Sequence, residues 1–313
     1  MNPAFPIPFS KMSGSGNDFI IIDHRRGFLG GVDLPSFVRA VCRRRFAVGA
    51  DGLILIEDSE TADFRWQFFN GDGSRAEMCG NGARCAARYA YLKKIAPAAM
   101  RFETVAGLIE AQVMDGSVKI KMTQPDSVLL GQKLLLAGKE RVFHSINTGV
   151  PHAVHFVADA GAVPVVDWGR PVRFHEKFQP AGTNVNFVQV MSRDSLAVRT
   201  YERGVEAETM ACGTGAAAAA IIGALLGHVA PPVTVVTSGG ARLTIHFVLK
   251  TGQHPEITEV FLEGRANVIY EGQLAAECLL DVGVREQEEK KGEQSGRWRK
   301  YLAFGHASAE FTE

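Results

Sequence analysis

Two cysteines share a short signature that suits them to acid–base chemistry. Cys79 begins CGNG and Cys212 begins CGTG, and an Ala-rich segment typical of a helix follows each signature. A cysteine at the start of a helix faces unpaired backbone N–H groups and the positive end of the helix dipole, and both favour the thiolate. We therefore expect the pKa of each thiol to fall from about 8.5 to below about 7.5.

Two such cysteines on opposite sides of one carbon would invert its configuration. One sulfur, as thiolate, would remove a proton, and the other, as thiol, would deliver a proton to the opposite face. The glycines beside each cysteine leave room for a ligand near the backbone, and N–H groups at a helix N-terminus bind anions such as a carboxylate. The pattern indicates an epimerase that acts next to a carboxylate, in a site closed to water and lined by hydrogen-bond donors.

The three other cysteines lack this setting. Cys42, Cys85 and Cys278 have no adjacent glycine, and we expect them to serve packing. The five cysteines include no CxxC pair, which argues against a disulfide framework and a structural zinc site. Neither signature has the glycine spacing of a dinucleotide-binding loop, and no lysine follows as in a phosphate-binding loop. The chemistry therefore rests on Cys79 and Cys212.

Composition excludes several classes of partner. The chain of 313 residues carries 34 basic and 34 acidic side chains, which argues against binding to nucleic acid or to a membrane surface. No apolar run approaches the roughly 20 residues of a membrane span. The first residues, MNPAFPIPFSKM, lack the layout of a secretion signal. We therefore expect a cytoplasmic protein.

The cysteines need elements that place them. We expect one helix over about 82–94 and another over about 215–226, and a third, amphipathic helix over about 35–44. The second of these is almost entirely apolar, so it should be wrapped by sheet on most sides. Short β-type runs separated by turn clusters dominate the rest of the chain, at residues 19–22, 53–56, 64–69, 118–122, 185–190, 233–236, 243–247 and 267–270.

The repeated signature predicts two similar α/β halves, each with a cysteine at the N-terminus of a buried helix. A β-type run and an acidic turn precede each signature, as in FFNGDGSRAEM and RTYERGVEAETMA. We expect the first half to comprise residues 1–125 together with about 267–284, and the second half to comprise 126–266. Residues 285–313 are rich in charge and are interpreted as an appended, solvated tail.

The chain resembles the diaminopimelate epimerase family over roughly residues 9–272. The matching motifs occur in order: KMSGSGNDFIIID, RRRFAVGADGLILIE, FFNGDGSRAEMCGNGARC, NTGVPHAV, GTNVNFVQV, RTYERGVEAETMACGTGAAAA and VFLEGRANVIYEG. This resemblance implies interconversion of LL- and meso-diaminopimelate for lysine and peptidoglycan synthesis, without pyridoxal phosphate or a metal. It also implies two pseudo-symmetric halves, each a mostly antiparallel sheet or barrel around a central helix, and a homodimer.

The resemblance also assigns roles to individual residues. It gives proton transfer to Cys79 and Cys212, and it has His152 and Glu202 each assist one of them. Arg203 suits a distal carboxylate because its guanidinium offers two parallel hydrogen bonds. The substrate-binding residues that the resemblance implies are Asn17, Asn70, Gly80, Asn81, Asn184, Glu202, Arg203, Gly213 and Thr214.

Other functions remain open at this point. Val150 stands where many members of the family have asparagine, so one contact to the distal end of the substrate is missing. The main alternative is a cofactor-independent racemase of another amino acid, of the proline or histidine type. The proline racemase group usually has a histidine after its first Cys-Gly, where this chain has Asn81. A binding protein without two-thiol chemistry and a thiol-redox protein are further alternatives, but the former has no need of both cysteines and the latter favours a CxxC pair.

Overall fold

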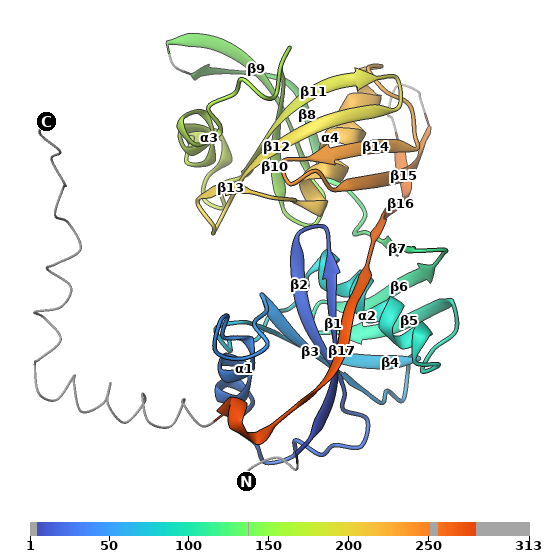
Figure 1. The fold of residues 1–313 in the computed structure, drawn as a ribbon. Coiled ribbons are helices and arrows are strands. Elements are labelled where there is room, and N and C mark those ends of the chain that lie inside the picture. The colour runs from blue at the N-terminus through green and yellow to red at the C-terminus, as the bar shows by residue number, and fades with distance from the viewer. Residues whose placement is uncertain (1–4, 137, 251–255, 280–313) are drawn as a thin grey trace, which may run out of the picture.

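Two lobes lie one above the other in the computed structural model, which describes residues 5–136, 138–250 and 256–279 (Figure 1). They are joined where β7 (Ser117–Lys121) pairs antiparallel with β16 (Glu256–Arg265). The expected tail, 285–313, lies outside the described residues. No helix within these ranges has the length and apolar character that crossing a membrane requires.

Strands of the first lobe pair in the order β17–β1–β2–β3–β4–β5–β6–β7. The β2–β3 and β4–β5 pairs are parallel, and the others are antiparallel. The last strand of the chain, β17, therefore returns to the first lobe and pairs with β1 (Figure 1). The bounds are β1 Ile7–Gly14, β2 Asn17–Asp23, β3 Gly52–Glu57, β4 Phe64–Asn70, β5 Ala99–Thr104, β6 Gly107–Val113 and β17 Asn267–Leu274.

The second lobe repeats this pattern in the order β8–β9–β10–β11–β12–β14–β15–β16. Here the parallel pairs are β10–β11 and β12–β14, and a short strand, β13, pairs with β12. Both lobes thus have the same succession of pair directions, and the predicted fold of two pseudo-symmetric halves is confirmed. The bounds are β8 Asp126–Leu136, β9 Lys139–Asn147, β10 Pro151–Phe156, β11 Asn184–Ser192, β12 Ser195–Glu202, β13 Ala207–Thr209, β14 Val233–Thr237 and β15 Arg242–Lys250.

Helices make the crossovers that parallel strand pairs require. In the first lobe α1 (Leu34–Cys42) joins β2 to β3, and α2 (Gly80–Leu92) lies between β4 and β5. In the second lobe α3 (Val165–Arg173) lies between β10 and β11, and α4 (Gly213–Leu225) lies between β13 and β14. Two short 3-10 helices, Glu176–Phe178 and Ala276–Leu279, complete the description. By position, α2 and α4 are equivalent.

The two equivalent helices are central because their side chains are small and mostly apolar. Every residue of α4 from Gly215 to Ala224 is buried, as are most residues of α2. Both helices belong to one continuous apolar cluster, which also includes Ile120 of β7 and Leu262 of β16. Smaller clusters lie under α1 and α3. The joining strands therefore share the core that fixes the two helices.

Most expected elements are confirmed, but their boundaries shift. Each of the predicted strands overlaps an observed one. The two central helices begin at Gly80 and Gly213, two residues earlier than predicted, because each cysteine itself occupies the N-cap position. Helix α3 was not predicted, because Gly169 and Pro171 within it are poor helix formers.

We expect replacement of a fully buried α4 side chain to destabilise the fold strongly. Ile222→Ala should lower the free energy of unfolding by about 2–5 kcal/mol, because the side-chain carbons that it removes leave a cavity among tightly packed neighbours. Val248→Ala, at a side chain 46% exposed on β15, should cost less than about 1 kcal/mol. Urea denaturation measures both, and equal losses would contradict a central position for α4.

Candidate active site

Cys79 and Cys212 occupy equivalent positions in the two lobes. Each is the N-cap of a central helix, with an extended backbone conformation at φ −146° and φ −122° respectively. Both side chains are half-buried. The first turn of each helix contains glycine at its first and third positions, so little side-chain bulk separates the thiol from the backbone N–H groups.

The same backbone groups act on each sulfur. Cys212 Sγ accepts a hydrogen bond from the Gly215 N–H at 3.4 Å and lies 3.5 Å from Thr214 Oγ1. The N–H groups of Asn81 and Gly82 face the Cys79 thiol and lower its pKa, although no cap hydrogen bond of normal length forms there. In both lobes the contributing N–H groups come from the second and third residues after the cysteine, as the shared signature predicts.

Burial nevertheless outweighs these groups. It raises the pKa of the Cys79 thiol and raises the pKa of Cys212 to about 11. The negative charge of the Glu202 carboxylate raises the pKa of both thiols further. The expectation that the helix starts lower these pKa values below about 7.5 is wrong for the free protein, in which both cysteines are thiols at neutral pH.

An amide chain joins the start of α2 to the β1–β2 turn. Asn81 Nδ2 donates to Asn17 Oδ1 at 2.7 Å, and Asn17 Nδ2 donates to Asp51 Oδ2 at 3.0 Å. Asn81 Oδ1 accepts from Arg84 Nη2 at 2.6 Å. The structure thus brings two of the predicted substrate-binding asparagines together beside Cys79.

A second amide joins β10 to the end of β12. Asn184 Nδ2 donates to the Pro151 carbonyl oxygen at 3.2 Å, and its Oδ1 accepts from the Arg203 backbone N–H at 2.8 Å. The Arg203 guanidinium donates to the Ala181 carbonyl oxygen at 2.9 Å. Among the described residues no carboxylate lies within ion-pair distance of Arg203. Its charge is therefore available to a ligand.

His152 is neutral, and its tautomer follows from its neighbours. Asn186 Nδ2 donates to the Ala153 carbonyl oxygen at 3.1 Å, which only accepts, so this atom is the amide nitrogen, and it also faces His152 Nδ1 at 3.1 Å. Asn186 Oδ1 then accepts from Thr200 Oγ1 at 2.9 Å. An amide nitrogen only donates; Nδ1 therefore accepts, and the ring hydrogen lies on Nε2. Burial, with the nearby Arg203 charge, lowers the pKa of His152 to about 3. The buried Nε2 has no hydrogen-bond partner among the described residues.

The two lobes meet beside these groups. Gly16, in the turn between β1 and β2, packs against Met210, and a methyl group at position 16 would lie 3.5 Å from Met210 Cβ. The Thr214 carbonyl oxygen accepts from Thr148 Oγ1 at 3.0 Å. A methyl group at Gly213 would lie 2.9 Å from Leu262 of the joining strand β16, and one at Gly80 would lie 3.7 Å from Ile120 of β7. Both helix starts therefore adjoin the strands that link the lobes.

Asn70 differs from the other predicted residues. It is exposed at the end of β4, where its side chain donates to Ser74 Oγ at 3.0 Å and its backbone N–H donates to the Ser74 carbonyl oxygen. These bonds close a turn, which is the ordinary role of asparagine in such a segment. Its contact with a substrate stays a prediction.

Three polar residues near the site were not predicted from the sequence: Arg84, Asn186 and Asp51. Arg84 and Asn186 are fully buried polar residues, one in an Ala-rich helix and the other on the inward face of β11. The available signal for both was a polar side chain at a position where the surrounding pattern is apolar. However, the partners of Asn186, and Ser15 among those of Arg84, lie far away along the chain.

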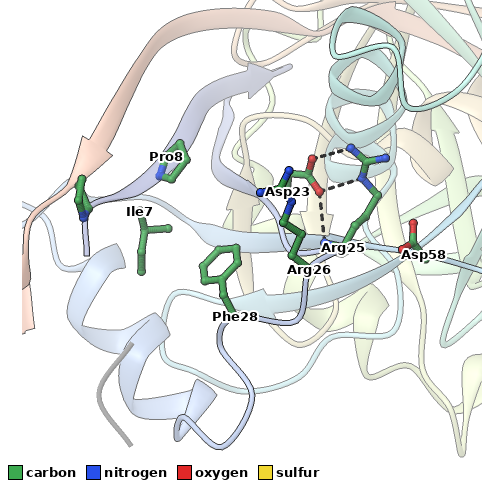
Figure 2. A pocket seen from close by; sticks show the side chains of 8 residues that line it. Ile7, Pro8, Asp23, Arg25, Arg26, Phe28 and Asp58 are labelled. Atoms are coloured by element: carbon green, nitrogen blue, oxygen red, sulfur yellow. Dashed lines mark hydrogen bonds and ion pairs between the residues drawn. The ribbon is translucent and has the colours of Figure 1, made fainter. Parts of the chain in front are cut away.

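A separate cavity of about 600 Å³ lies on the first lobe, away from the cysteines (Figure 2). Its lining includes Pro6, Ile7 and Phe28 together with Asp23 and Arg25. Asp23 and Arg25 point toward one another and form two hydrogen bonds of 2.8 and 2.9 Å, so their charges are already paired. This cavity shares no residue with the cysteine site, and its chemistry does not suggest proton transfer.

Several solved structures have the same fold as this chain. A phenazine biosynthesis protein of the PhzF family from Bacillus anthracis aligns with a TM-score of 0.63 at 15% identity, over 87% of this chain and 100% of that one. A hydroxyproline epimerase from Agrobacterium vitis aligns with a TM-score of 0.61 at 16% identity, over 88% and 94% of the two chains. At such low identity these similarities support the fold alone.

Sequence comparison is more specific. A protein named diaminopimelate epimerase from Aquifex aeolicus is 50% identical over 281 residues, which is 87% of this chain and 99% of the relative. One of the same name from Hydrogenobaculum is 46% identical over 86% of this chain and 99% of the relative. One from Archaeoglobus fulgidus is 42% identical over 86% and 96%. The family model for diaminopimelate epimerase matches residues 9–128 and 144–266. The chain belongs to the diaminopimelate epimerase family.

Proposed function

We propose that this protein interconverts LL- and meso-diaminopimelate by a two-base mechanism, for the synthesis of lysine and peptidoglycan precursors. The observation that carries the proposal is the pair of cysteines at equivalent N-cap positions of the two central helices. The identity of the substrate is inferred from membership of the family. One cysteine, as thiolate, removes the α-proton, and the other, as thiol, protonates the opposite face.

The helix starts would bind the reacting end of the substrate. The N–H groups after each cysteine, with Gly80 and Asn81 in one lobe and Gly213 and Thr214 in the other, form the proposed seat for the α-carboxylate. The positive α-ammonium group would then lie near the sulfurs and favour a thiolate, which the free protein does not hold at neutral pH. We propose that the thiol proton passes to Glu202, which acts electrostatically on both cysteines.

One positively charged side chain and three neutral amides would recognise the distal end of the substrate. Arg203 would pair with the distal carboxylate, which fits a guanidinium without a carboxylate partner among the described residues. Asn17, Asn70 and Asn184 would serve the distal ammonium and carboxylate groups. A substrate without these groups would leave polar side chains unpaired, so simple amino acids should be rejected.

His152 is proposed to assist one cysteine as a neutral donor. Its Nε2–H is buried and has no partner within residues 5–136, 138–250 and 256–279, and such a group is costly unless a ligand or a reacting atom uses it. A racemase of another amino acid remains the alternative, since a hydroxyproline epimerase has the same fold. The available charge of Arg203 favours a substrate with a second carboxylate.

Three further proposals concern the whole molecule. The lobes would act as domains, residues 1–125 with about 267–284 and residues 126–266, that close to exclude water. A homodimer would cover the exposed apolar side chains Val268, Ile269 and Tyr270 of β17, which lie beside the end of α2 where Lys93 bonds Glu271 at 2.7 Å. The cytoplasm is the proposed location.

Either Cys79→Ala or Cys212→Ala should lower the rate of epimerisation by about 10²–10⁴-fold, because inversion needs both a proton acceptor and an opposed donor. Chiral chromatography of diaminopimelate, with deuterium uptake from D₂O at Cα, measures the reaction. Cys278→Ala, at a half-buried residue of the last 3-10 helix, is the matched control and should keep full activity. A wild-type protein that racemises proline instead would favour the alternative function.

Arg203→Ala should raise the KM for diaminopimelate about 10–100-fold, because a charge-assisted hydrogen bond to a carboxylate contributes about 1.5–3 kcal/mol. Arg193→Ala, at an exposed arginine in the β11–β12 turn, should leave KM unchanged. Steady-state kinetics decide the question, and equal KM values for both variants would place the distal contact elsewhere.

Asn186→Asp should move the His152 ring hydrogen from Nε2 to Nδ1, because a carboxylate oxygen in place of the amide nitrogen accepts instead of donating. The pKa of His152 should rise from about 3, and activity should fall about tenfold or more. Nitrogen-15 NMR distinguishes the tautomers. His155, whose Nδ1 donates to the Val142 carbonyl oxygen at 2.7 Å, provides an internal reference. Unchanged His152 signals would show that Asn186 does not set its tautomer.

A further inference from the structure

A buried positive charge in α2 takes no part in the mechanism above. Arg84 is fully buried, one helical turn beyond the start of the helix that Cys79 caps. Among the described residues no carboxylate lies within ion-pair distance of its guanidinium. Removing an unpaired cation from water costs several kcal/mol, so a charge in this place is maintained only where a function or a compensating anion requires it.

The guanidinium is held by neutral acceptors. Nη1 donates to the Gly80 carbonyl oxygen at 3.2 Å, and Nη2 donates to Ser15 Oγ at 2.8 Å and to Asn81 Oδ1 at 2.6 Å. Nε is buried and has no partner in the part of the chain that the structure describes. Gly264 of the joining strand β16 packs against it, since a methyl group there would lie 3.1 Å from Nε. Contacts from both lobes thus fix the position of Arg84.

Two sulfurs neighbour this charge. Cys85 is the next residue of α2, and Cys79 directly precedes Gly80, whose carbonyl oxygen accepts from Arg84 Nη1. Cys85 is fully buried within the apolar core, where burial raises the pKa of its thiol to about 12, so it stays protonated. Cys79 stands at the helix start and faces the N–H groups of Asn81 and Gly82. Of the two, Cys79 is the sulfur that can become the compensating anion.

The cysteine of the other lobe has a different electrostatic environment. The charged groups that act on Cys79 are Arg84, which favours the thiolate, and Glu202, which opposes it. On Cys212, Glu202 opposes ionisation and is the largest contribution after burial. The equivalent residue of α4 is Ala217, which carries no charge. The two thiols therefore have similar backbone geometry but differ in the charged groups that surround them.

The fork of Arg84 also sets the orientation of two amides. A guanidinium only donates, so the Asn81 atom that faces it must be Oδ1. The Asn81 amide nitrogen must then face Asn17, whose Oδ1 accepts from it, and the Asn17 amide nitrogen is left to face Asp51. Arg84 at one end of this chain and the Asp51 carboxylate at the other thus impose the same orientation on the Asn81 and Asn17 amides.

We propose that Arg84 is a positioning residue that favours ionisation of Cys79 over Cys212 and holds the Asn81 and Asn17 amides in one orientation. This inference rests on the proposed function, because it assigns unequal roles to the two proposed bases. The charge and the forked hydrogen bonds are separable contributions, and each has its own test.

The charge is tested by alkylation with iodoacetamide between pH 7 and pH 10.5, with peptide mass spectrometry to follow each cysteine. Arg84→Met should slow alkylation of Cys79 at pH 7 about tenfold, which corresponds to one pKa unit, while Cys212 in the same sample keeps its rate. Arg88→Met is the matched control, since Arg88 lies one turn further along α2 and donates to the Ala266 carbonyl oxygen. It should leave the rates at both cysteines unchanged.

The fork is tested by Arg84→Lys, which keeps the charge but cannot span three acceptors. We expect the alkylation profile of Cys79 to stay close to that of the wild type and the KM for diaminopimelate to rise about tenfold. Circular dichroism and thermal unfolding establish that each variant is folded. If Arg84→Met does not fold, the wild-type protein tests the charge: the midpoint of the alkylation pH profile should be lower for Cys79 than for Cys212, and equal midpoints would overturn the inference.

Two further results would overturn the inference. One is a folded Arg84→Met protein whose Cys79 alkylation profile matches the wild type, or in which both cysteines slow equally. The other is an unchanged KM in Arg84→Lys. Failure of the proposed function is distinguishable, because wild-type protein would then not epimerise diaminopimelate, whereas the alkylation rates of Cys79 and Cys212 would still report on Arg84.

Discussion

The chemistry proposed for this protein depends on the pKa of two thiols, which burial raises and nearby backbone N–H groups lower. A two-base inversion requires thiols that are shielded from water, but shielding opposes the thiolate that must form. The N–H groups after Cys79 and Cys212 offset part of this cost, and burial still dominates in the free protein. In the proposed mechanism, ionisation is therefore coupled to the arrival of a substrate that carries its own positive charge.

The doubled fold follows from this requirement. Opposed sulfurs need two helix starts that face a common space, and a chain that repeats one β-strand pattern places the same N-cap in each lobe. The pairing of β7 with β16 and the shared apolar cluster bind the repeats together. The two lobes share a backbone pattern but differ in their side chains: Arg84 in α2 corresponds to Ala217 in α4. A symmetric scaffold thus carries an asymmetric site.

Local features were predictable because they depend on neighbouring residues. Gly-flanked cysteines before Ala-rich runs indicate helix starts, and the repetition of that pattern predicts the two halves. Tertiary features were not predictable in this way. The pKa of Cys212 depends on burial by distant strands, and Arg84 meets Ser15 from 69 positions away in the sequence. Helix α3 was missed because tertiary packing, with Val165 and Val172 buried, overrides the weak helix propensity of Gly169 and Pro171.

The central claim is that Cys79 and Cys212 lie on opposite sides of one reacting carbon, close enough to bond when no substrate separates them. Mild oxidation followed by peptide mass spectrometry tests it directly. The account predicts a Cys79–Cys212 disulfide that forms in step with loss of activity, is reversed by dithiothreitol, and is prevented by diaminopimelate. Oxidised, inactive protein in which both of these thiols are still free, or in which each is joined to another cysteine, would contradict it.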